Sequence, residues 1–143
     1  MNRSLAALSL ALLAVGVTTA CAPSSGDVEE NVLSAASEGS TLPIRDLLFD
    51  DGAERFTIAC PYEAAEDVAA RLDVDAKAVP DLSDRDDAQA LVVVTADGID
   101  AGEFPRDRVD LCSTGDAWPV YQGGDETTLT VTQGDDDVYV VTR

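Results

Sequence analysis

The apolar segment at the start of this chain restricts most strongly what the rest can fold into. Residues 5–17 read LAALSLALLAVGV, a run of 13 residues that follows Met1, Asn2 and Arg3. A helix needs about 20 apolar residues to cross a bilayer, so this run is too short for a permanent span. A basic start, a short apolar run and a small-residue exit are typical of a secretory signal peptide. Only the residues beyond it are then available for a folded, exported domain.

A cysteine follows this run, and the residues around it indicate how the segment is processed. Residues 18–21 read TTAC, with small residues immediately before the cysteine. This pattern resembles the lipobox of bacterial lipoproteins, although Leu is usual where Thr18 stands. The resemblance implies that Cys21 receives a diacylglycerol, that residues 1–20 are removed, and that Cys21 becomes the N-terminus. The alternative is an ordinary signal peptidase site, with Cys21 left as an odd thiol.

An acylated cysteine would determine where the protein acts. Each buried CH₂ group of an acyl chain contributes about 0.8 kcal/mol, and two chains hold a small protein on a bilayer where one is marginal. The expected location is the extracytoplasmic face of the cell membrane. The membrane is then one partner, through the lipid anchor.

The number of cysteines agrees with acylation and predicts a disulfide. Three cysteines would leave one unpaired in an oxidising compartment. Acylation of Cys21 leaves Cys60 and Cys112 as a pair, 52 positions apart. Closing a loop of this length contributes about 4 kcal/mol in the chain-entropy model. We expect a structural bond rather than a redox site, because the sequence has no C-x-x-C motif.

Charge and composition exclude several classes of function. The chain has 28 acidic and 9 basic residues, and loss of Arg3 with the signal peptide changes the formal charge from −19 to −20. Such a surface disfavours nucleic acid as a partner and would attract a cationic protein. The simpler interpretation is a solvated acidic surface. The absence of histidine excludes Ser-His-Asp and Cys-His catalysis and His-containing zinc sites, and no cofactor is expected.

Hydrophobic spacing predicts the elements of the first half of the mature chain. The expected elements are, in order, a tether (21–26), a short helix from Asp27 to before Gly39, a helical piece within 44–49, a strand (55–60) and an amphipathic helix (63–72).

Two hairpins are expected in the second half. The apolar run 91–94 predicts a strand buried on both faces, which returns as 99–104 after a type I′ turn at Asp97-Gly98. The alternating segment TLTVT at 128–132 is expected to pair with 138–141.

These elements predict a small single α+β domain over residues 27–143. Strands outnumber helices and neighbouring strands are joined by hairpins. We expect one antiparallel sheet, made of the two hairpins and the strand 55–60, packed against one or two helices.

Several short motifs resemble a group of small uncharacterised exported bacterial proteins. They are RFTI at 55–58, Pro61-Tyr62, the helical segment 66–72, LVVV with the following Asp97-Gly98, and Pro105-Arg106. The resemblance implies an α+β fold and an exported setting, and it implies no activity. The chain departs from the group at Glu63, where a Ser or Thr cap is usual, and at Asp73, where Gly is usual.

Three residues are candidates for ligand binding. Tyr62 and Arg106 are the polar members of the shared motifs, and Trp118 belongs to an aromatic set with Tyr121 and Tyr139. Aromatic residues often anchor interfaces. The alternative, which we favour, is a structural role at strand ends and at the edge of the core.

Acidic clusters are the remaining candidates, and they do not predict a metal site. They comprise Asp81, Asp84, Asp86 and Asp87 in one loop and residues 135–137 in another. Neither has the spacing, the fixed glycine and the terminal Glu of an EF-hand loop.

Together these features predict a lipid-anchored extracytoplasmic module without enzymatic activity that binds another envelope protein or a ligand. One alternative is an acidic inhibitor of a cationic hydrolase, such as a lysozyme-like enzyme. An alternative of another class is a carboxylate- or metal-dependent enzyme.

Overall fold

The computed structural model describes residues 25–38, 40–48 and 52–143. The predicted signal peptide (1–20), Cys21 and the first part of the tether lie outside the described residues. The elements are, in chain order, α1 (Ser25–Glu38), β1 (Thr41–Pro43), the 3₁₀ helix η1 (Ile44–Leu47), β2 (Ala53–Ala59), α2 (Ala65–Leu72), η2 (Ala76–Ala78), β3 (Ala88–Thr95), β4 (Gly98–Pro105), β5 (Val109–Asp110), β6 (Tyr121–Gln122), β7 (Thr128–Gln133), η3 (Asp135–Asp137) and β8 (Tyr139–Thr142).

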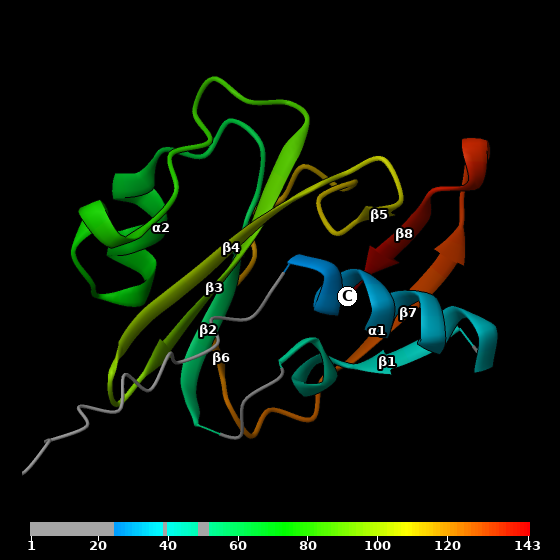
Figure 1. Cartoon of the computed structure of the whole chain (residues 1–143), viewed down its shortest axis with the longest axis horizontal. Coiled ribbons are helices and arrows are strands. Elements are labelled where there is room, and N and C mark those ends of the chain that lie inside the picture. Colours follow the sequence, from blue (N-terminus) through cyan, green and yellow to red (C-terminus); the bar gives the residue numbers. More distant parts are fainter. Residues whose placement is uncertain (1–24, 39, 49–51) are drawn as a thin grey trace, which may run out of the picture.

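The strands form two four-stranded sheets (Figure 1). The first sheet has the order β4-β3-β2-β6, and the second has the order β1-β7-β8-β5. All pairs are antiparallel except β5 with β8. The α+β class is therefore confirmed, whereas the single sheet is wrong because the two hairpins lie in different sheets. The second sheet is completed by two very short strands, β1 and β5, which the hydrophobic pattern does not mark.

The central strands of the first sheet, β2 and β3, are largely buried on both faces. Phe56 and Ile58 point into the central core, whereas the alternate residue Ala59 points toward α2. The continuous run 91–94 on β3 is buried throughout, as predicted. The helix α2 covers one face through Val68 and other apolar residues at helical spacing.

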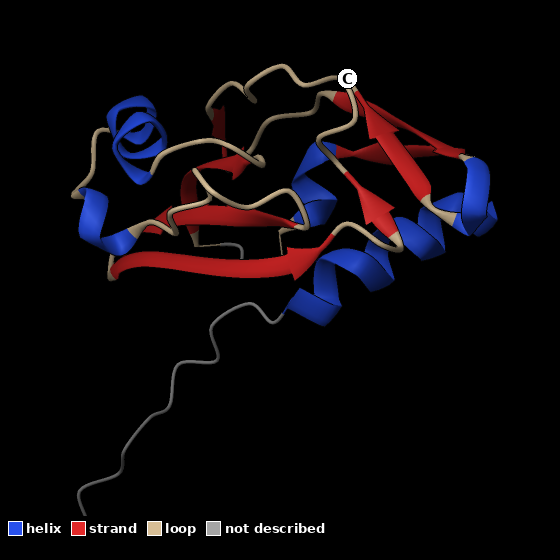
Figure 2. Ribbon diagram, turned by 90° about the horizontal axis from the view of Figure 1, so that it is seen from above, coloured by secondary structure: helices blue, strands red, loops and turns tan. Residues whose placement is uncertain are grey.

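The second sheet is buried on one face only. Leu129 and Val131 of β7 point into the central core, where they meet Val28 and Val32 of α1. The alternate residues of β7, Thr128, Thr130 and Thr132, are exposed. Figures 1 and 2 show this sheet at the opposite end of the molecule from α2.

Three predicted details differ. The helix α1 begins at Ser25 rather than Asp27, and α2 begins at Ala65 rather than Glu63. Thr95 pairs with Gly98, so the loop of the first hairpin is Ala96-Asp97 and the predicted type I′ turn at Asp97-Gly98 is wrong. Gly98, with φ of 149°, is the first residue of β4, and a glycine suits this backbone region. The second hairpin, β7 with β8, is confirmed.

Candidate functional site

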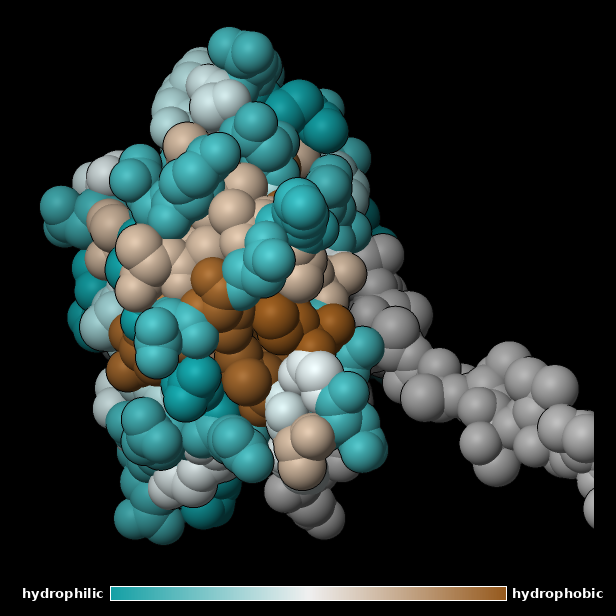
Figure 3. All heavy atoms as spheres, turned by 90° about the vertical axis from the view of Figure 1, so that its left-hand side faces the viewer, coloured by the Kyte–Doolittle hydropathy of each residue, from teal (hydrophilic) through white to brown (hydrophobic). Residues whose placement is uncertain are grey.

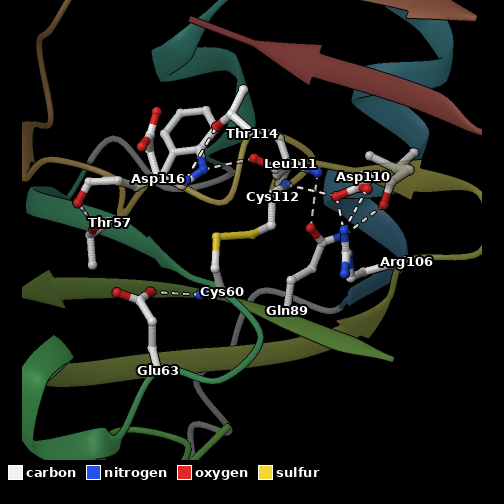
Figure 4. The surroundings of a disulfide bond; sticks show 12 residues. Thr57, Cys60, Glu63, Gln89, Arg106, Asp110, Leu111, Cys112, Thr114 and Asp116 are labelled. Carbon is white, nitrogen blue, oxygen red and sulfur yellow. Dashed lines mark hydrogen bonds and ion pairs between the residues drawn. A yellow bond between two sulfur atoms is a disulfide. The ribbon is translucent and has the colours of Figure 1, made fainter. Parts of the chain in front are cut away.

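A groove of about 410 Å³ lies beside the disulfide and brings together two of the three candidate residues. We call it the disulfide groove. It is lined by Cys60, Pro61, Tyr62, Glu63, Arg106, Cys112, Ser113, Gly115 and Ala117. The predicted bond between Cys60 and Cys112 is confirmed, with the Cα atoms 5.6 Å apart and both residues buried. Cys60 follows β2 and Cys112 follows β5, so the bond links the two sheets (Figure 4).

Arg106 forms one wall of the groove and is held in a single orientation by Asp110. Its Nε and Nη2 donate to the two carboxylate oxygens at 3.1 and 2.6 Å. Its Nη1 donates to the backbone oxygen of Asp86 at 3.2 Å. Asp110 also accepts the backbone N–H of Cys112 at 2.7 Å. Bidentate pairs of this kind are among the stronger polar contacts in proteins, so the guanidinium group is engaged within the fold.

Glu63 forms the opposite wall (Figure 4). Its carboxylate accepts the backbone N–H of Cys60 at 2.8 Å and forms a bidentate ion pair with Arg71. Glu63 thus caps the end of β2, while the N-cap position of α2, Ala64, has no side-chain hydrogen bond. Arg106 is paired with Asp110, and Glu63 is paired with Arg71. Because both charged side chains of the lining have a partner of opposite charge within the protein, the groove is close to electrically neutral in a strongly acidic chain.

A buried glutamine that the sequence reasoning missed supports the groove from below. Gln89 is fully buried on β3; its amide nitrogen donates to the carbonyl oxygen of Val109, and its amide oxygen accepts the N–H of Leu111 at 2.9 Å. These bonds tie the segment before Cys112 to the first sheet (Figure 4). The available signal was a polar residue on the core-facing side of an otherwise apolar strand.

Tyr62 is the unusual residue of the groove. Its backbone takes a left-handed conformation with φ of 66°, held by hydrogen bonds from its N–H to the carbonyl oxygens of Leu82 and Arg85 at 2.8 and 3.2 Å. A bulky residue is strained in this region. The residue is 69% exposed, and it is the one large hydrophobic residue exposed in the described part of the chain.

Trp118, the third candidate, lies in the core and does not line the groove. It is 2% exposed, and its indole N–H donates to the carbonyl oxygen of Leu111 at 2.7 Å. Its ring contacts Tyr121 edge-on, and the guanidinium carbon of Arg143 lies 5.3 Å from the ring centre. These contacts assign Trp118 to packing.

The acidic loop between η2 and β3 uses carboxylates to shape itself. Asp81 accepts the backbone N–H of Ser83 at 3.1 Å, which lowers the pKa of Asp81. Arg85 pairs with Asp87 at 2.7 Å and lowers the pKa of that carboxyl group. Among the described residues, no three acidic or cysteine side chains converge as they would around a metal ion.

A second hollow, of about 550 Å³, lies between α1, β1 and η1. The side-chain amide of Asn31, in its lining, donates to the backbone oxygen of Asp46. The adjoining residues 39 and 49–51 lie outside the described part. The disulfide groove is therefore the better-defined candidate.

The lining of the disulfide groove suits binding more than acid–base chemistry. Its one carboxylate, Glu63, is engaged by Arg71 and by a backbone N–H. What the groove offers to a partner is the exposed ring of Tyr62 beside Pro61 and the Ser113 side chain. Comparison with known proteins adds no candidate activity: no family model, curated protein or solved structure matches this chain.

Proposed function

We propose that this protein is a lipid-anchored extracytoplasmic module that binds another envelope protein at the disulfide groove. The observation that carries the proposal is the exposed, strained Tyr62. The residue is largely exposed, whereas the backbone around it is held by hydrogen bonds and by the adjacent disulfide. A rigidly presented aromatic side chain is a common anchor at protein interfaces.

One finding supports the location. A disulfide between Cys60 and Cys112 is consistent with an oxidising, extracytoplasmic compartment. In the part of the chain that the structure describes, no helix is long and apolar enough to cross a bilayer. The proposed attachment is through an acylated Cys21, for which the sequence TTAC is the support.

The start of α1 makes the proposed attachment a close one. The helix begins at Ser25, four positions after Cys21, and is packed into the central core through Val28 and Val32. Four extended residues span at most about 14 Å. The folded domain would lie near the bilayer surface, which favours partners that are themselves in or on the membrane.

The test is capture of partners from solubilised membranes. We expect the wild-type protein to retain an envelope protein that Tyr62→Ala loses, while Thr130→Ala, an exposed position on the second sheet, retains it. Equal capture by all three proteins would contradict a role for the groove. Mass spectrometry of the N-terminus, with Cys21→Ser as control, tests the anchor separately.

A further inference from the structure

The outer strand of the first sheet, β4, lies near α1 and, among the described residues, has no strand paired along its outer edge. It pairs with β3 over all eight of its residues, from Gly98 to Pro105, without a bulge. It is the last strand of the sheet on that side. An edge of this length is a ready template for another strand unless something protects it.

The register determines which backbone groups are free. Thr95 and Gly98 flank a two-residue loop, so they form a hydrogen-bonded pair, and the bonded pairs recur at every second residue. The N–H and C=O groups of Asp100 and Gly102 therefore point to β3. Those of Ile99, Ala101 and Glu103 point outward, and within the described residues no backbone partner is found for them.

The side chains along this edge are apolar and acidic. Ile99 is partly buried against the core on the α2 side, as are Val74 and Val120. Figure 3 shows an apolar area on this side of the molecule, bordered by hydrophilic side chains. Ala101 and Glu103 are exposed, and Asp100 is half-buried.

The charges near the edge favour a cationic partner. The acids are Asp97 in the loop, Asp100 and Glu103 on β4, and Asp87 beyond its end. The cations are Arg85, which pairs with Asp87 and Glu103, and Arg106, which follows β4 and is paired with Asp110. Lys77 belongs to η2, an element that contacts β4. Two copies of this chain paired edge to edge would bring their acidic residues together, and like charges across a strand pair are destabilising.

We propose that the β4 edge binds an extended cationic segment of a partner protein by strand addition. The inference rests on the proposed binding role but concerns a different surface from the disulfide groove. Antiparallel pairing would set a basic residue opposite Glu103, an apolar one opposite Ala101, a basic one opposite Asp100 and an apolar one opposite Ile99. The recognised segment therefore reads basic, any residue, apolar, basic, apolar.

A synthetic peptide tests this pattern. The probe is acetylated and amidated KTVKVT, titrated into the exported chain carrying Cys21→Ser, with amide hydrogen exchange measured by NMR. Saturation with peptide should slow exchange at Ile99, Ala101 and Glu103 about tenfold or more and leave Asp100 and Gly102 unchanged, because only the outward N–H groups gain partners. The control peptide ETVEVT should give no protection. Equal protection by both peptides, none by either, or protection without peptide that grows with protein concentration overturns the proposal.

Two variants locate the binding. Ala101→Pro removes an outward N–H without touching a bond to β3, and it should weaken peptide binding about tenfold, while Ala101→Thr should not. The double variant Asp100→Asn with Glu103→Gln should remove most of the salt dependence of peptide binding. The control double variant Asp116→Asn with Asp136→Asn removes the same number of charges elsewhere and should leave that salt dependence unchanged.

Tyr62→Ala separates the two proposals. If it abolishes peptide binding, the peptide occupies the groove and the edge proposal fails. If it abolishes only capture of the envelope protein, both proposals stand. If the peptide protects the edge but Tyr62→Ala still captures the partner, only the role of the groove fails.

Discussion

The two sheets of this protein bury their strands in different ways. The first sheet lies between the central core and α2, and β3 is apolar on both faces. The second sheet covers the central core with one face and exposes the other, where Thr41, Thr130 and Thr142 form a row across three strands. The comparison shows that the hydrophobic pattern of a strand reports how many of its faces are covered, and not which strands share a sheet.

The disulfide cross-links the two sheets, and its removal should give one of the largest effects. Cys60→Ser with Cys112→Ser should lower the free energy of unfolding by about 2–5 kcal/mol, because the unfolded chain gains entropy. Urea unfolding followed by the fluorescence of Trp118 measures this, and Cys21→Ser is the control. An unchanged midpoint would show that packing alone holds the sheets together.

Truncation of core residues sharpens the comparison between the sheets. Leu91→Ala in the first sheet and Leu129→Ala in the second should each lower the free energy of unfolding by about 2–5 kcal/mol, since both side chains are fully buried in the central core. Thr130→Ala, on the exposed face, should change it by less than about 0.5 kcal/mol. If Leu129→Ala resembles Thr130→Ala, the second sheet contributes little to the cooperative fold.

Substitution of the buried Gln89 tests the hydrogen bonds that join β3 to the segment before Cys112. Gln89→Leu should lower the free energy of unfolding by about 1–3 kcal/mol, because it leaves the Val109 carbonyl and the Leu111 N–H buried without this partner. Hydrogen exchange at Leu111 should rise in the same variant. Unaltered protection at that amide would contradict the role assigned to Gln89.

Tyr62, which follows β2, is a position where substitution by glycine should cost less stability than substitution by alanine. Glycine accepts the left-handed conformation, so Tyr62→Gly should be more stable than Tyr62→Ala by about 0.5–1 kcal/mol. Thermal unfolding of the two variants provides the measurement. A less stable glycine variant would mean that the backbone at this position is not strained.

The smallest effect concerns alkaline pH. Burial raises the pKa of Tyr121, which packs on Phe56 of the first sheet. The folded state therefore holds the phenolic proton more tightly than the unfolded state, and stability falls as pH rises above the ordinary value of 10.0. Between about pH 9 and about pH 11, the urea midpoint should fall further for wild type than for Tyr121→Phe. Parallel loss in both proteins would assign the alkaline sensitivity to other groups.

Much of the local structure was predictable because it depends on local periodicity. The 3.6-residue spacing of Val28, Val32 and Ala35 predicts α1, and the alternation in TLTVT predicts β7. The loop of the first hairpin was misplaced by one residue. Turn preferences favour Asp97-Gly98 as the loop, whereas the pairing of β3 with β4 places the loop at Ala96-Asp97.

The candidate site was predictable only in part. Tyr62 and Arg106 were recognised as candidates, but their meeting beside the disulfide depends on segments more than 40 residues apart. The left-handed backbone of Tyr62 and the burial of Trp118 carry no mark in the sequence. Gln89 acquires its role from the carbonyl and N–H groups that happen to face it.

By itself the sequence determined the acidic character, the absence of histidine chemistry, the pair of cysteines and most helices and strands. These depend on composition and on neighbours along the chain. The division into two sheets, the open edge of β4 and the groove were decided by tertiary structure alone. The reason is that strand partners are chosen by the shared burial of distant segments, and even a three-residue strand such as β1 completes a sheet once its neighbour is in place.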